Sequence, residues 1–272
     1  MLRRTMPVAA VLALVFSAAG RSAGAQATVA ADLSLFSGYV WRGISVTNRP
    51  VGQPSAYVVF PAGNASATVG GWANVDLGRY DDGDDFSQSG GVSSFNLAEF
   101  DPWAEVSVPA GKATLTGGVV GYVFPNDVGA TDDLNTWEVY GKVGLAVPLS
   151  PKLAVYYDVD KVNGAYIEGT VAHTVPLGAV SLNLGALAGL SAGQAEADDP
   201  DELNNFAENG FTHLDLSAGA PFTAGIFSIT PVVHFVVNGD EITRFTSPGD
   251  ESDVKVWGGF TLSWSRALGR TR

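Results

Sequence analysis

Five tight turns recur along this chain, each built around proline and each placed between two stretches in which apolar and polar residues alternate. These turns occupy residues 60–64, 108–112, 147–151, 175–179 and 220–225. The connections between them are mostly longer and often acidic. In an up-and-down β-barrel, short turns gather on one rim and longer loops on the other. The spacing of the turns therefore predicts strands that run back and forth between two such rims.

The stretches between the turns have the two-residue period of a half-buried strand. From 137 to 147 the odd positions are apolar or glycine, whereas the even positions include Glu138 and Lys142. From 253 to 264 the even positions are apolar or glycine. Because successive side chains of a strand point to opposite sides, each stretch has one apolar and one polar face.

Counting these stretches gives twelve predicted strands. They are residues 31–45, 54–61, 65–78, 96–109, 112–125, 135–148, 152–161, 165–176, 179–191, 210–221, 226–238 and 252–265. An even number returns both termini to one rim, which is then the rim of the proline turns. The remaining connections, on the opposite rim, are 46–53, 79–95, 126–134, 162–164, 192–209 and 239–251. The predicted fold class is all-β: a closed, up-and-down antiparallel transmembrane β-barrel of twelve strands.

A soluble β-sandwich is the main alternative to this barrel. It would share the alternation and would bury the apolar face in a core. It would not explain why short and long connections segregate to opposite rims. Beyond the first residues, the chain also lacks the roughly 20 continuous apolar residues of a transmembrane helix. The transmembrane barrel is therefore the favoured prediction.

The first residues have the pattern of a secretory signal peptide. Arg3 and Arg4 give a positive start, residues 7–19 are too short an apolar stretch to cross a bilayer, and small residues follow. The three expected segments are a cleaved signal peptide at 1–27, the transmembrane barrel at 28–265 and a short basic C-terminal tail at 266–272. We expect an exported barrel of this kind in the outer membrane of a bacterium.

The charge and the cysteine count exclude several classes of partner and chemistry. The formal net charge is −13, and residues 1–27 hold three arginines and no acid, so the expected mature chain carries −16. Such an acidic chain argues against a nucleic-acid partner, whose phosphates it would repel. The absence of cysteine excludes disulfides and thiolate chemistry. No cofactor is implied.

Three motifs occur in order in the first third of the chain. They are Ser-Gly-Tyr-Val-Trp-Arg-Gly-Ile-Ser at 37–45, Gly-Trp-Ala-Asn-Val-Asp at 71–76 and Glu-Phe-Asp-Pro-Trp at 99–103. Together they resemble the opening of the TorF-type porin family of proteobacterial outer-membrane β-barrels. The resemblance implies an outer-membrane porin. This sequence departs from the common ending of outer-membrane proteins, because Trp264 is followed by eight further residues.

The alternation places a set of charged side chains on the polar face of the predicted strands. They are Arg42, Asp76, Glu99, Asp101, Glu105, Glu138, Lys142, Asp158, Asp160, Glu168, Asp215 and Lys255. A Lys or Arg that faces lipid at the midplane costs about 2–4 kcal/mol, so this face is expected to line the lumen. One interpretation is a wet, net-negative channel for cations or neutral polar solutes. The other is a filled barrel in which these groups pair with one another.

Two acidic loops and the aromatic residues each allow two interpretations. The loops at 81–85 and 196–202 could bind Ca²⁺ through clustered carboxylates, but neither has EF-hand spacing, and we favour simple solvation over a metal site. The six tryptophans, with Tyr39, Tyr122, Tyr156 and Tyr157, lie mostly near predicted strand ends. They are expected to form girdles at the membrane surfaces, with a sugar-stacking platform as the alternative.

Enzymatic chemistry has little support in this sequence. There is no G-x-S-x-G elbow, no H-E-x-x-H and no P-loop, and only three histidines are present. An outer-membrane hydrolase and a structural or adhesive barrel acting through its loops stay open as alternatives. The favoured function is a porin-like channel, not an enzyme, for passive diffusion of small hydrophilic, cationic or neutral solutes. Its expected partners are outer-membrane lipid and small polar solutes or ions, with the oligomeric state open.

Overall fold

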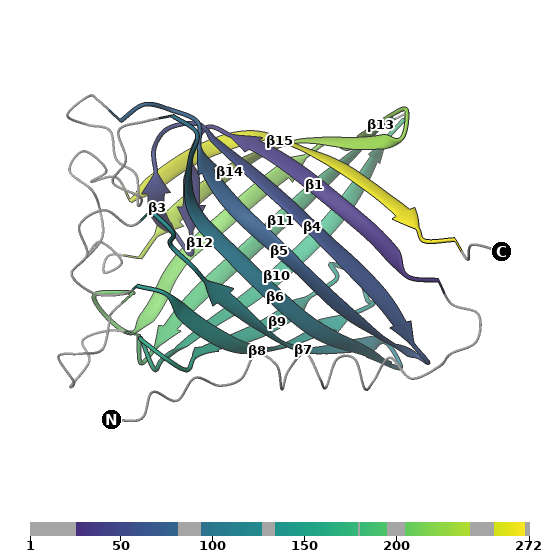
Figure 1. Cartoon of the computed structure of the whole chain (residues 1–272), viewed down its shortest axis with the longest axis horizontal. Helices are drawn as coiled ribbons and strands as arrows, with labels where there is room; N and C mark the ends of the chain where they lie inside the picture. Colours follow the sequence, from purple (N-terminus) through teal and green to yellow (C-terminus); the bar gives the residue numbers. More distant parts are fainter. Residues whose placement is uncertain are drawn as a thin grey trace.

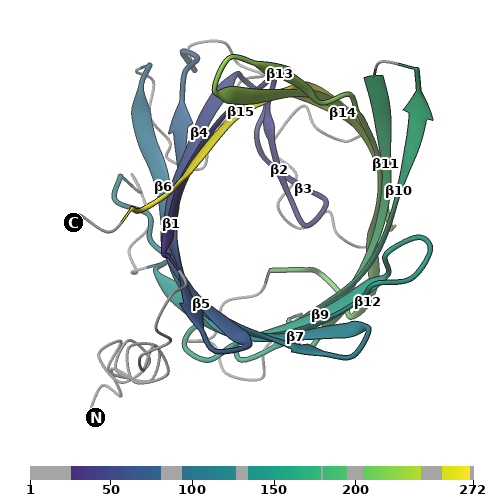
Figure 2. The same ribbon diagram turned by 90° about the vertical axis from the view of Figure 1, so that its right-hand side faces the viewer.

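A computed structural model describes residues 26–80, 94–126, 134–178, 180–194, 205–239 and 253–269. Within these residues, twelve antiparallel strands form the wall of a barrel (Figures 1 and 2). They are β1 (Thr28–Phe36), β4 (Val51–Ala62), β5 (Ala65–Asp76), β6 (Asn96–Ala110), β7 (Ala113–Tyr122), β8 (Thr136–Leu145), β9 (Lys152–Asp158), β10 (Ala165–Leu177), β11 (Val180–Ala192), β12 (Gly210–Gly219), β14 (Phe227–Asn238) and β15 (Val254–Ala267). A short strand, β13 (Phe222–Ala224), continues along β14 where β12 stops.

The sheet closes on itself through β1. This strand pairs with β4 on one side and with β15 on the other, so that Thr28 lies opposite both Val59 and Ala267. Every other wall strand pairs antiparallel with its neighbours in chain order. Closure pairs the edges of the first and last strands, which would otherwise present free backbone groups. The prediction of a closed, up-and-down barrel of twelve strands is confirmed.

The five proline turns lie on one rim, together with the start of β1 and the end of β15 (right-hand side of Figure 1). Four of the turns contain a glycine in the left-handed region, with φ between 65° and 69°. These are Gly63, Gly111, Gly178 and Gly225. The β8–β9 turn instead holds Leu149 and Ser150 at φ of 67° and 39°. Because a tight hairpin needs positive φ, the proline and glycine pattern correctly marked this rim.

The wall has an apolar outer face and a polar inner face. Large apolar side chains such as Leu115, Leu153 and Phe235 are exposed on the outside. On the inside, Asn74 and Glu138 are almost fully buried although both are polar. This inverts the pattern of a soluble protein, in which the apolar face is the buried one.

The first predicted strand is wrong beyond Phe36. The wall strand covers 28–36, and the chain then turns inward to form β2 (Tyr39–Trp41) and β3 (Ile44–Thr47), a separate two-stranded ladder. Figure 2 shows this hairpin inside the ring of wall strands. We call residues 37–50 the lumen hairpin. The error arose because the hairpin strands keep the two-residue alternation of the wall.

A second difference concerns the end of β9, which was predicted at 161. The strand ends at Asp158, whose carboxylate accepts hydrogen bonds from the backbone N–H groups of Asp160, Lys161 and Val162, each at 2.9 Å. These bonds form a turn that the periodic pattern does not reveal. Asp160 was expected on the lumen face, but it lies beyond the strand and is exposed.

Some predictions fall outside the described residues. They concern most of the signal peptide and the two acidic loops at 81–85 and 196–202. In the described part of the chain, no helix is long and apolar enough to cross a membrane. In the same part, no group of three or more His, Cys, Asp or Glu side chains is arranged to hold a metal ion.

Candidate functional site in the barrel lumen

The tip of the lumen hairpin is the two-residue turn Arg42-Gly43, which joins the paired residues Trp41 and Ile44. Both turn residues have positive φ, 51° for Arg42 and 87° for Gly43. This is the geometry of a type I′ hairpin turn, which glycine adopts freely and arginine does not. A non-glycine residue in this region is strained, and Arg42 is held there by the contacts of its side chain.

Gly43 lets the tip approach the opposite wall more closely than any other residue would. A Cβ at this position would lie 2.8 Å from Cβ of His213 on β12 and 2.9 Å from Oδ1 of Asn238 on β14. Real Cβ atoms do not come so close, so the position requires glycine for space as well as for its backbone angle.

Arg42 reaches across the lumen to β8. Its Nη1 and Nη2 donate to the two carboxylate oxygens of Glu138 at 2.7 Å and 2.6 Å, and Nη2 also donates to the Tyr122 hydroxyl at 3.3 Å. The side chains of Arg42 and Glu138 are 6% and 1% exposed. A bidentate pair of this kind fixes orientation as well as distance. The hairpin tip is therefore bound to the far wall by a buried ion pair.

Aromatic rings surround the same guanidinium group. Its central carbon lies 4.4 Å from the ring centre of Trp41, 4.2 Å from that of Tyr166 and 5.2 Å from that of Tyr156. Each distance allows a cation–π contact. Burial alone would lower the pKa of Arg42, but the neighbouring Tyr122 and Glu138 raise it above its ordinary value. The group therefore stays protonated.

The base of the lumen hairpin contacts the opposite side of the barrel. Tyr39 packs against Trp72 on β5 with ring centres 5.5 Å apart, and its side chain lies near Glu99 on β6. Asp101, two residues further along β6, lies next to Glu99. Thr47 and the Tyr80 hydroxyl form a hydrogen bond of 2.8 Å. The hairpin is thus attached at its base as well as at its tip.

The aromatic residues at this site were expected near the membrane surfaces. Tyr39 and Trp41 instead belong to the lumen hairpin, and Tyr122 and Tyr156 contact Arg42 from the wall. Sequence reasoning therefore missed the aromatic surroundings of Arg42. The one signal in the sequence is the run Trp41-Arg42-Gly43 between two alternating stretches. It indicates a hairpin tip only if Arg42 and Gly43 are read as a two-residue turn.

A second polar group lies on β6 and β8. Glu105 accepts a hydrogen bond from the Tyr140 hydroxyl at 3.0 Å, and Lys142 Nζ lies 3.5 Å from the Glu105 carboxylate. Lys142 also lies 4.2 Å from the ring centre of Tyr140. Glu105 and Lys142, both predicted lumen residues, thus lie close enough to form an ion pair. The Lys142–Glu105 pair is less buried than the Arg42–Glu138 pair.

Other predicted lumen residues belong to local networks. Asp76 accepts a hydrogen bond from Asn74, which itself accepts one from Gln53. Asp158 accepts one from Thr136 in addition to its backbone contacts. Lys255 is buried on the inner face of β15. Asp32 on β1 is an inner carboxylate that the sequence analysis did not include. It accepts a hydrogen bond from Ser55 on β4.

Asp215 forms a compact group with an imidazole and an indole. Its carboxylate lies 2.9 Å from Nδ1 of His234 on β14. The His234 ring stacks on Trp257 of β15, with ring centres 4.0 Å apart and planes only 5° from parallel. Nε1 of Trp257 is buried and has no hydrogen-bond partner. This side of the lumen therefore contains a fixed carboxylate beside an unsatisfied N–H donor.

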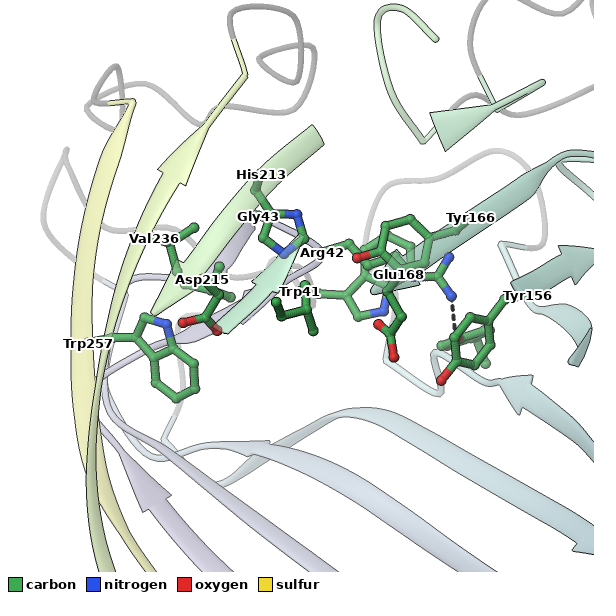
Figure 3. A pocket seen from close by; sticks show the side chains of 13 residues that line it. Trp41, Arg42, Gly43, Tyr156, Tyr166, Glu168, His213, Asp215, Val236 and Trp257 are labelled. Carbon is green, nitrogen blue, oxygen red and sulfur yellow. Dashed lines mark hydrogen bonds between the residues drawn. The ribbon is translucent and has the colours of Figure 1, made fainter. Parts of the chain in front are cut away.

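A cavity of about 280 Å³ lies between the hairpin tip and residues of the wall strands β7, β9, β10, β11, β12, β14 and β15 (Figure 3). The hairpin contributes Trp41, Arg42 and Gly43 to its lining. The wall contributes the carboxylates of Glu168 and Asp215. Of the predicted lumen residues, the structure thus brings Arg42, Glu168 and Asp215 together around one space. Asp76, Lys142 and Lys255 are not among its lining residues.

Comparison with known proteins identifies similarity at the level of family and barrel fold. A family model described as "Bacterial protein of unknown function (Gcw_chp)" matches residues 19–230. No curated protein matches the sequence.

The solved structures that resemble the barrel include the following three. An outer membrane channel from Pseudomonas putida F1 is 12% identical, with a TM-score of 0.46 over 90% of this chain and 97% of that one. A structure from a study of the in-meso crystallization of membrane proteins is 11% identical, with a TM-score of 0.45 over 89% and 84%. The translocator domain of autotransporter NalP from Neisseria meningitidis is 10% identical, with a TM-score of 0.40 over 96% and 94%.

Proposed function

Because this chain belongs to Gcw_chp, a bacterial family of unknown function, its role has to be inferred from its own residues, and we propose that it is an outer-membrane channel. The channel would allow passive diffusion of small hydrophilic solutes. The observation that carries the proposal is a closed barrel whose charged side chains face inward and whose apolar side chains face outward. The proposal assigns no catalytic residue and no cofactor.

The outer face supports a location in a lipid bilayer. Its apolar side chains, among them Val139, Leu184 and Phe260, are about two-fifths exposed. In water this would be an unfavourable surface, but in a bilayer it is the surface a barrel needs. Most wall strands have the roughly 9–11 residues or more that a tilted strand needs to cross the hydrocarbon core. The expected signal peptide at 1–27 is consistent with export to the outer membrane, with the proline-turn rim and both termini on the periplasmic side.

The inner face supports a preference for cations or neutral solutes. Arg42 and Lys142 are both engaged with carboxylates, through Glu138 and Glu105. Further carboxylates, including Asp32, Glu168 and Asp215, leave an excess of negative charge inside the barrel. An anion entering this lumen would be repelled, whereas a cation would be attracted. The proposed solute class follows from this imbalance.

The lumen hairpin would act as the constriction of the channel. It crosses the interior between β6 on one side and β8, β12 and β14 on the other. A solute would have to pass beside it, through the space that includes the 280 Å³ cavity. The TorF-type porin resemblance of residues 37–45, 71–76 and 99–103 favours the same function.

Single-channel conductance tests this proposal. Refolded mature protein would be inserted into a planar bilayer under a KCl gradient, and heat-modifiable gel migration would serve as the check of folding. We expect discrete current steps with a cation-selective reversal potential. A folded barrel that passes no current would contradict the channel.

The lumen hairpin also favours a second candidate, a closed barrel with a structural or adhesive role. In that case the Arg42–Glu138 pair would keep the interior permanently filled, and the loops would carry the function. The two candidates differ in one result: the closed barrel conducts no ions even when the hairpin contacts are weakened by substitution, whereas the channel then conducts more.

A further inference from the structure

We propose that the cavity beside the hairpin tip is a binding site for a small organic cation of the amino-alcohol class, with an ammonium group and a hydroxyl group. This inference deepens the proposed function, because it names the solute class, and it rests on that function for the route by which the solute enters. The site is formed jointly by the lumen hairpin and the wall strands, and it contains groups suited to both ends of such a molecule.

Two carboxylates give the cavity its charge. Glu168 comes from β10 and Asp215 from β12, and Figure 3 shows both at the edge of the same space below the hairpin tip. The Glu168 side chain lies near the Tyr156 side chain. The carboxylate of Asp215 lies 2.9 Å from Nδ1 of His234. The wall therefore places two carboxylates where they would attract the positive charge of an ammonium group.

The basic residue in the lining does not cancel this charge. Among the described residues that line the cavity, Arg42 is the only lysine or arginine. The guanidinium group of Arg42 already donates hydrogen bonds to both carboxylate oxygens of Glu138. His213 is the other titratable base in the lining, and its Nδ1 lies 3.0 Å from the Thr212 hydroxyl. The carboxylates of Glu168 and Asp215 thus remain available to a ligand.

Aromatic rings complete the environment of a cation. Trp41, Tyr156, Tyr166 and Trp257 all line the cavity. Three of these rings already lie within cation–π distance of Arg42, which indicates that their faces are directed toward this region of the lumen. An organic ammonium ion is more easily desolvated than a metal ion and gains from such faces.

An unsatisfied donor suggests what the other end of the ligand carries. Trp257 lines the cavity together with Asp215, and its Nε1 is buried without a hydrogen-bond partner. A buried N–H without a partner is unfavourable, and a hydroxyl oxygen of the ligand would satisfy it. A simple alkylammonium ion lacks that acceptor, and an anion would be repelled by the two carboxylates. The combination points to an amino alcohol.

Choline is the probe for a direct binding test. Isothermal titration would be performed at constant ionic strength on refolded barrel in a polyoxyethylene detergent, which carries neither choline nor sugar. We expect saturable binding to one site, with tetramethylammonium binding more weakly and glucose not competing. Glu168→Gln should weaken choline binding by about tenfold or more, because the Coulombic attraction between the carboxylate and the trimethylammonium group is lost. Asp215→Asn, a second variant in case the first fails to fold, should have the same effect.

Asp32→Asn is the matched control. It removes an inner carboxylate on β1, whose hydrogen-bond partner is Ser55 and which does not line the cavity. Choline affinity should be unchanged in this variant. Equal affinity in the wild type, Glu168→Gln and Asp215→Asn would overturn the inference, as would glucose binding as tightly as choline or a folded barrel that binds no choline.

Conductance measured on the same samples separates this inference from the channel proposal. If the barrel conducts ions but binds no choline, the channel proposal stands and the choline-site inference is wrong. If the barrel binds choline but conducts no ions, the choline-site inference stands and the channel proposal is wrong.

Discussion

Arg42 and Glu138 are 96 residues apart in the chain, yet they form a bidentate ion pair across the barrel lumen with N–O distances of 2.7 Å and 2.6 Å. Arg42 lies at the strained tip of the lumen hairpin and Glu138 on the inner face of β8. The pair therefore connects a loop inside the barrel to the wall that surrounds it. Its strength should influence both the stability of the barrel and the width of the free passage.

Removing one member of this pair should be costly. Glu138→Ala leaves a buried guanidinium without its carboxylate, and we expect the free energy of unfolding to fall by about 3–5 kcal/mol. Urea unfolding of the barrel refolded into lipid vesicles would measure it. Replacing both members by apolar residues, in Arg42→Met with Glu138→Leu, should recover most of this loss, because no unpaired charge remains.

The matched control for this prediction is Glu105→Gln. Its partner Lys142 is about a third exposed, so the pair is partly solvated, and its loss should cost at most about 1 kcal/mol. Equal losses in Glu138→Ala and Glu105→Gln would mean that the ion pair of the hairpin tip has no special importance for stability.

Gly43→Ala should move the hairpin tip without preventing barrel assembly. The added methyl group would lie 2.8 Å from Cβ of His213, and the backbone at φ of 87° would be strained as well. The expected results are a normally heat-modifiable barrel and a conductance changed by twofold or more. Planar-bilayer recording measures this effect.

Gly63→Ala separates the steric contact with His213 from the backbone strain at positive φ. Gly63 has a similar positive φ of 66° in the β4–β5 turn, but a methyl group added there would have no atom within 4 Å. This variant should lose about 1 kcal/mol of stability from backbone strain and keep the wild-type conductance. A conductance that is unchanged in Gly43→Ala as well would show that the tip contact does not control the passage.

The sequence was sufficient to predict the wall strands of the barrel but not the arrangement of residues in its lumen. Wall strands follow from alternation and turn chemistry, which are local, and eleven of the twelve predicted strands agree with the structure to within a few residues. The lumen hairpin has the same alternation as a wall strand, so its residues 39–45 were predicted as part of the first strand, which was expected to end at 45. Only Gly43, which the tip requires for space and backbone angle, distinguishes it.

The identity of charge partners depends on closure of the barrel and not on local pattern. Glu138 was expected on the lumen face, and it meets Arg42 only because the closed barrel surrounds the inward-turned lumen hairpin. The same holds for Glu168 and Asp215, which come from different strands and meet at the cavity. Asp160 shows the opposite case, in which a local hydrogen-bonded turn at Asp158 removes a residue from the face that alternation assigned to it.

Ion selectivity should depend on the carboxylates beside the hairpin. Glu168→Gln removes a negative charge from the lumen cavity, and we expect the reversal potential in a KCl gradient to shift toward that of an unselective pore. Asp160→Asn is the control, because Asp160 is exposed beyond the end of β9. The shift should be clearly smaller in this control. An equal shift in both variants would indicate that selectivity is set at the rim and not beside the hairpin.

The outer face offers a test of membrane embedding that does not depend on conductance. Val139 is 40% exposed near the middle of β8, on the side opposite Glu138. If this face contacts the hydrocarbon core, Val139→Arg should lower the free energy of unfolding from lipid vesicles by about 2–4 kcal/mol.

Leu177→Arg is the matched control, since Leu177 is 54% exposed at the end of β10 beside a proline turn. At a membrane surface the same substitution should cost only about 0–1 kcal/mol. A soluble barrel would tolerate arginine equally at both positions, because both side chains would already be in water. The difference in unfolding free energy between the two variants is therefore the quantity to measure, and a difference near zero would contradict the bilayer location.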